Sequence, residues 1–129
     1  ATLTFTSDGG SITANTSSDQ IAYTKVGRVV HFQGSISVSA ISSPTGWTRL
    51  VGLPASVASL NDNAAYASPV IRVDGLASDS GVSGALQGYL GADTNWFYIQ
   101  AFDGQNAHNI SEHIGTSTSF VVNGTYIAA

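Results

Sequence analysis

Apolar and polar residues alternate along residues 28–39, and this alternation is the clearest structural signal in the chain. Apolar or small side chains occupy every second position, and polar side chains occupy the positions between them. A period of two places these sets on the buried and solvated faces of a β-strand. A shorter strand pattern covers residues 20–25, and Val26-Gly27 follows it with a glycine suited to the positive φ of a tight turn. The sequence therefore predicts a β-hairpin.

The rest of the chain repeats these strand patterns, separated by clusters of Gly, Asp, Asn, Ser and Pro that are typical of turns. Further strands are predicted at residues 2–6, 47–53, 69–76, 82–90, 94–102 and 119–127. Turns are predicted at residues 7–10, 43–46, 60–63, 78–81 and 103–106. Helical periodicity is weak, and residues 55–60 form one helical turn at most. About eight strands predict a single all-β domain over residues 1–129, an antiparallel β-sandwich of the jelly-roll type.

The low fraction of charged residues limits the classes of partner that the chain can bind. Charged residues make up 9% of the sequence, against roughly 25% in ordinary soluble domains. Four Lys and Arg residues against eight Asp and Glu leave a net charge of −4, so no basic surface for nucleic acid is expected. No apolar run approaches the roughly 18 residues of a membrane span, so no membrane insertion is expected. Uncharged surfaces suit an extracellular or particle-borne domain, or an oligomer that buries its outer faces against its own copies.

The two ends of the chain suggest a fragment. The chain begins at Ala1 and contains no Met, and its last predicted strand runs almost to Ala129. We therefore expect the C-terminal part of a longer protein. There is no Cys, so neither disulfides nor thiolate metal sites are formed.

Candidate catalytic and metal-binding groups are sparse. The string at residues 81–85 lacks the second glycine of a G-x-S-x-G elbow, and Glu112 is the only Glu that a carboxylate pair could use. The three histidines, at positions 31, 108 and 113, form no H-x-H or HExxH string. Acidic turns at residues 61–63, Asp79 and Asp103 lack the spacing of a calcium loop. We expect no enzyme activity, no metal and no cofactor.

Aromatic residues are the remaining candidates for ligand binding. In residues 93–100, alternation places Phe97 with Ile99 on one face and Trp96 with Tyr98 on the other. If Phe97 and Ile99 face the core, Trp96 and Tyr98 form an outward aromatic pair beside amide groups, which suits a saccharide. The same rings would equally suit a subunit interface or the core. The candidate ligand-binding residues are Trp47, Asp93, Asn95, Trp96, Tyr98 and Gln100.

Three segments resemble C-terminal domains of bacteriophage tail fibres and related virion appendages. Residues 23–34 match the opening hairpin of those domains, which commonly read Y-x-K-x-G-R-x-V with a glycine a few residues on. Thr45-Gly46 leading to Gly52-Leu53-Pro54, and the closing residues 120–127, agree with the same group.

The resemblance implies a β-sandwich or jelly-roll module at the exposed end of a virion fibre, usually a homotrimer joined to the rest of the fibre. Such a module would bind a host cell-surface glycan or protein receptor. The alternative is a trimerisation cap or capsid-decorating spike with no soluble ligand. The matched segments contain no catalytic residues.

Overall fold

Every strand pair in the structure, a computed structural model that describes residues 1–77, 86–102 and 107–129, is antiparallel. This confirms the all-β antiparallel class. Two 3-10 turns, η1 (Asn61–Asn63) and η2 (Ser111–His113), interrupt the strands. In order, the strands are β1 (Thr4–Ala14), β2 (Ile21–Val26), β3 (Val29–Val51), β4 (Val70–Asp74), β5 (Leu86–Tyr89), β6 (Trp96–Phe102), β7 (Ala107–His108) and β8 (Ser119–Ile127).

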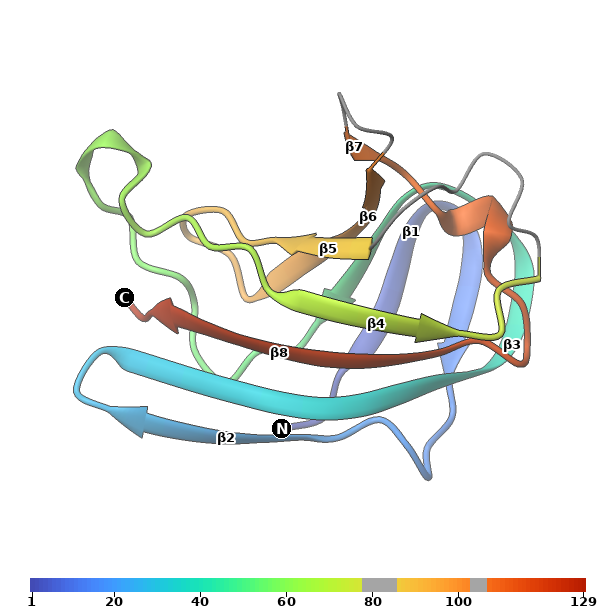
Figure 1. Ribbon diagram of the computed structural model, residues 1–129, viewed down its shortest axis with the longest axis horizontal. Helices are drawn as coiled ribbons and strands as arrows, with labels where there is room; N and C mark the ends of the chain where they lie inside the picture. Colours follow the sequence, from blue (N-terminus) through green and yellow to red (C-terminus); the bar gives the residue numbers. More distant parts are fainter. Residues whose placement is uncertain (78–85, 103–106) are drawn as a thin grey trace.

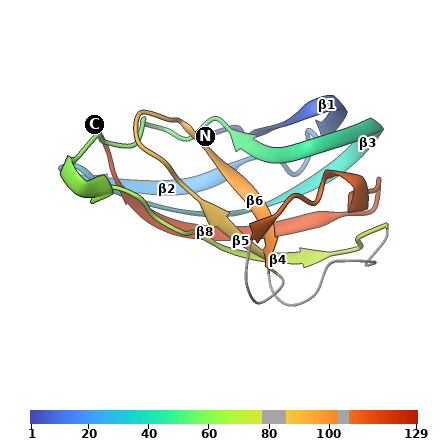
Figure 2. The ribbon, with the colours of Figure 1, turned by 90° about the horizontal axis from the view of Figure 1, so that it is seen from above.

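The long strand β3 closes the sheet on itself. Its first part pairs with β2 and β8, and its second part pairs with β1 and β6. Because β8, β4, β5 and β6 pair in turn, the order β3-β8-β4-β5-β6-β3 forms a closed five-stranded barrel. Strands β1 and β2, and the two-residue strand β7, are additional to this ring. Figures 1 and 2 show β3 curving from the β8 side to the β6 side. The more specific expectation of a jelly-roll sandwich is not confirmed.

The predicted hairpin is confirmed, with its turn one residue later than expected. Val26 pairs with Val29, so Gly27 and Arg28 form the two-residue turn, and Gly27 has a φ of 58°. The alternation in β3 is also confirmed from Val30 onward, since Val30, Phe32, Ile36 and Val38 are buried and the polar positions between them are mostly exposed.

Two of the predicted turns are wrong, because residues 7–10 and 43–46 lie within β1 and β3. These segments face each other, with Gly9 paired to Thr45, and the register shifts on both sides of Gly9. Ser43 and Gly46 adopt positive φ there without ending the strand. Turn-forming residues thus produce β-bulges, which bend and twist a continuous strand pair.

The remaining predictions have mixed outcomes. Residues 60–63 form the predicted turn around η1, whereas residues 55–60 form no helix. The predicted turns at 78–81 and 103–106, and the first part of the predicted strand 82–90, lie outside the described residues. In the described part of the chain, no helix is long and apolar enough to cross a membrane.

Aromatic rings fill the inside of the barrel. Phe32, Phe97 and Phe120 are fully buried, and the Phe32 ring contacts those of Phe97 and Tyr126 at centroid distances of 5.7 and 6.1 Å. Gly124 lies opposite Phe32, where a Cβ would come within 3.0 Å of the ring, so the absent side chain makes room for it. Because this packing occupies the interior, a ligand is expected to bind on the outer surface.

Candidate functional site: an aromatic face with an Arg–Asp pair

The alternation predicted for β6 is present. Phe97 and Ile99 are fully buried, and Trp96 and Tyr98 are half-buried on the outer side. The outward pair is expected only if Phe97 and Ile99 face the core, and they do. Trp96 and Tyr98 form this pair with ring centroids 4.8 Å apart.

Strand pairing extends this pair into a larger cluster. Tyr98 pairs with Arg49 on β3 and with Tyr89 on β5, so the three side chains form a row across neighbouring strands. The Tyr98 ring contacts those of Trp47 and Tyr89 at 5.8 and 6.1 Å. We call the set Trp47, Tyr66, Tyr89, Trp96 and Tyr98 the aromatic face.

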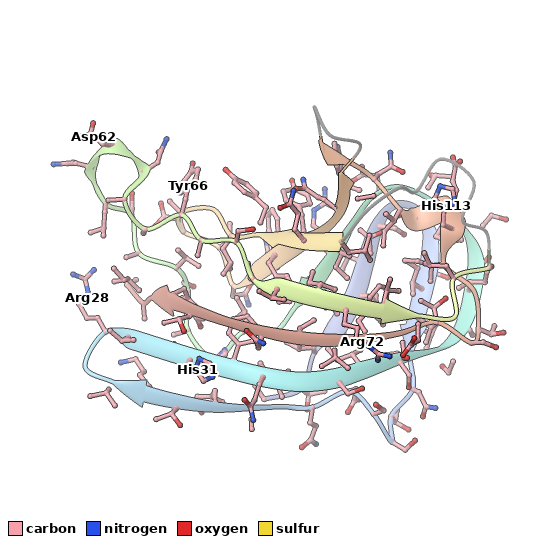
Figure 3. The ribbon with its side chains drawn as sticks, viewed as in Figure 1. Arg28, His31, Asp62, Tyr66, Arg72 and His113 are labelled. Atoms are coloured by element: carbon pink, nitrogen blue, oxygen red, sulfur yellow. The ribbon has the colours of Figure 1, made fainter. Side chains whose placement is uncertain are left out.

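The tyrosine end of the aromatic face is its most accessible part. Tyr66 and Tyr89 are 41% and 37% exposed, and their rings meet edge-to-face at 5.5 Å. Figure 3 shows Tyr66 between the η1 turn, marked by Asp62, and the body of the barrel. The pKa of the Tyr89 hydroxyl is raised, mainly by burial and to a smaller extent by a hydrogen bond with Tyr66. The Tyr89 hydroxyl is therefore protonated at neutral pH and can both donate and accept hydrogen bonds.

Arg49 lies at the centre of the aromatic face. Its guanidinium carbon is 5.1 Å from the Tyr98 ring centroid and 5.4 Å from that of Trp96, which is cation–π geometry. The Arg49 Nη2 also donates a 2.8 Å hydrogen bond to Asp8 Oδ1, forming an ion pair.

The bulged strand pair places Asp8 beside Arg49. The second carboxylate oxygen, Oδ2, accepts a 2.9 Å hydrogen bond from the backbone N–H of Trp47. Gly46 has a φ of 77°, and a Cβ there would overlap the Asp8 carboxylate, so glycine is required for this approach. The hydrogen bond from Trp47, and then the one from Arg49, lower the pKa of Asp8.

The structure brings together three of the six predicted site residues, Trp47, Trp96 and Tyr98. Gln100 follows Tyr98 on the same side of β6, opposite Gln87. Asp93 and Asn95 are exposed in the connection before β6, at the Trp96 end of the aromatic face.

Sequence reasoning missed four members of the site: Asp8, Arg49, Tyr66 and Tyr89. A signal existed for Arg49, since alternation in residues 47–53 places it on the same side as Trp47. A comparable signal existed for Tyr89 on the outer side of β5. None existed for Asp8, because its segment was assigned to a turn.

The candidate metal-binding residues do not form a cluster in the described part of the chain. Within residues 1–77, 86–102 and 107–129, no group of three or more His, Cys, Asp or Glu residues is arranged to hold a metal ion. The ring of His31 hydrogen-bonds the Thr125 hydroxyl at 3.0 Å. Asp79 and Asp103 lie outside the described residues.

The comparisons with known proteins find similarity to a solved structure. No protein-family model and no curated protein matches the chain. Among solved structures, the chain is similar to the crystal structure of the Dettilon tailspike protein, with a TM-score of 0.78 and 23% sequence identity. The match covers 100% of this chain but 23% of the tailspike chain. At this identity the similarity shows a shared fold.

Replacing Asp8 by Asn tests the electrostatics of the site. A carboxyl with a lowered pKa in the folded state stabilises the fold above its unfolded pKa, near 3.8. That contribution is lost as pH falls through the folded pKa. We expect Asp8→Asn to lower the unfolding midpoint at neutral pH and to match the wild type increasingly below pH 3.8. Urea unfolding across this range measures the difference.

Asp62→Asn is the control, because it removes a negative charge from the exposed η1 turn. A difference between Asp8→Asn and the wild type that stays constant from neutral to acid pH would contradict the assignment.

Proposed function

We propose that this domain is a module of a phage tail appendage that attaches to the host by binding a cell-surface saccharide on the aromatic face. The observation that carries the proposal is the row of rings on the outer surface, from Trp47 and Trp96 through Tyr98 and Tyr89 to Tyr66. The fold shared with a tailspike protein supports the virion context.

The chemistry of the aromatic face suits a sugar. The apolar C–H faces of sugar rings pack on aromatic rings, and Tyr and Trp combine apolar area with a polar group. The hydroxyls of Tyr66 and Tyr89 and the amide of Gln100 offer hydrogen bonds to sugar hydroxyls. Because the row crosses β3, β6 and β5, an extended saccharide would lie across the strands.

The hydrogen bonds of Asp8, the acidic residue that contacts Arg49 at this face, favour binding without hydrolysis. A glycosidase uses two carboxyl groups that flank the scissile bond. Asp8 has both oxygens engaged, one by Arg49 and one by the Trp47 amide, which leaves it poorly suited to proton transfer. We therefore propose attachment rather than degradation, and an assay for new reducing ends should detect none.

Substitution of Tyr89 by Ala tests saccharide binding. Tyr89 is exposed enough that its truncation should leave the fold intact, while a stacking contact with a sugar would be removed. We expect host-glycan affinity to fall by about tenfold or more, as for a central binding residue. A glycan array followed by calorimetry measures the loss.

Tyr23→Ala is the matched control, since Tyr23 is a tyrosine on β2 that is 49% exposed. An equal loss of affinity in both variants, or unchanged affinity in Tyr89→Ala, would exclude the aromatic face as the binding site.

A second surface favours the structural alternative, a trimerisation module. Strands β4, β8, β3 and β2 lie side by side, and Figure 1 shows their shared outer side. This side carries exposed valines and an Arg72–Asp74 ion pair, so few charges oppose contact between copies. We call the set Val26, Val29, Val70 and Val121 the valine face.

We propose that the chain forms a homotrimer through the valine face, which is compatible with saccharide binding on the aromatic face. Light scattering should give three times the mass of one chain. The paired changes Val70→Asp and Val121→Asp should shift this mass to that of a monomer, since charge on a buried contact is strongly unfavourable. The variant Tyr89→Ala should remain trimeric. A monomeric wild type, or a trimer that survives both Asp substitutions, would exclude this interface.

A further inference from the structure

Arg49 is the cation that contacts the aromatic rings. The other three Lys and Arg residues of the chain have interactions elsewhere: Lys25 and Arg28 with backbone carbonyls near the β2–β3 hairpin, and Arg72 with Asp74 on β4. A negatively charged ligand on the aromatic face would therefore depend mainly on Arg49 for electrostatic attraction.

The charge of Arg49 is already balanced by Asp8. Three features hold the Asp8 carboxylate beside the guanidinium. They are the ion pair at 2.8 Å, the hydrogen bond from the Trp47 amide, and the space left by the absent side chain of Gly46. The hydrogen bond to Asp8 raises the pKa of Arg49, and the pKa of Asp8 is lowered, so both groups stay charged across neutral pH. The pair contributes no net charge to the aromatic face.

The same pair remains able to bind uncharged polar groups. The Asp8 side chain is 44% exposed, so its oxygens can accept further hydrogen bonds. Arg49 is 22% exposed and has five N–H donors, of which the Asp8 contact uses one. Sugar hydroxyls both donate and accept, so they can bond the acceptor and the donor together. A ligand carboxylate or sulfate would meet a fixed negative charge at Asp8.

We propose that the aromatic face selects neutral saccharides, and that Asp8 acts as the selectivity residue by neutralising Arg49. This inference rests on the proposed function, since it names the class of saccharide for the same site. In a chain with a net charge of −4, long-range attraction of anionic glycans is also unfavourable.

The variant Asp8→Asn tests the inference, because it should gain affinity for anionic saccharides. The substitution removes the negative charge with little change in shape and leaves Arg49 with an unbalanced positive charge. We expect affinity for uronic or sialic acid oligosaccharides to rise by about two- to fivefold, the size of an exposed charge interaction. This gain should disappear at high salt. Misfolding cannot produce such a gain.

Asp19→Asn is the control, because it changes the net charge equally at a residue that belongs to neither the aromatic face nor the valine face. We expect the wild type to bind neutral hexose and N-acetylhexosamine oligosaccharides with affinity that is insensitive to salt. Asp19→Asn should keep this preference.

Three results would overturn the inference. A wild type that prefers anionic glycans in a salt-sensitive way would exclude neutral selectivity while leaving saccharide attachment intact. An Asp8→Asn variant that gains no anionic binding, or gains no more than Asp19→Asn, would exclude Asp8 as the selectivity residue. Binding to neither glycan class by the folded wild type would overturn the proposed function itself.

Discussion

The pairing of β3 with both β8 and β6 is the constraint on which the rest of the structure depends. A strand of 23 residues can take part in two sides of one barrel only if it bends strongly along its length. The register of the β1–β3 pair shifts on both sides of Gly9. β-Bulges of this kind bend the strand and increase its twist. Closure directs alternate residues of β3, β5 and β6 inward, which leaves Arg49, Tyr89 and Tyr98 outside in one row.

The same strand pair also carries the polar part of the site. Asp8 is separated from Arg49 by 41 positions in the sequence, but it follows two residues after Thr6, which pairs with Arg49, and the absent side chain of Gly46 leaves room for its carboxylate. The β1–β3 pairing and the glycine at position 46 therefore set the charge of the aromatic face.

Local patterns predicted local structure well. A period of two was sufficient for the hairpin at Gly27, for the inward direction of Phe97 and for the outward pair Trp96 and Tyr98. Turn chemistry was ambiguous, because Gly, Asp and Ser with positive φ can end a strand or produce a bulge within one. The closed barrel and the Asp8–Arg49 pair both depend on that choice, and they join residues far apart in sequence. Neither could be predicted from periodicity alone.

The outer surface thus combines an aromatic face, which we assign to a neutral saccharide, with a valine face, which we assign to self-association. The most direct test of this account is a crystal structure of the chain with a bound neutral oligosaccharide. The account predicts a sugar ring packed on Tyr89 and Tyr98, with a hydroxyl bonded to Asp8 or Arg49. A saccharide bound on the valine face, with the aromatic rings left uncovered, would contradict it.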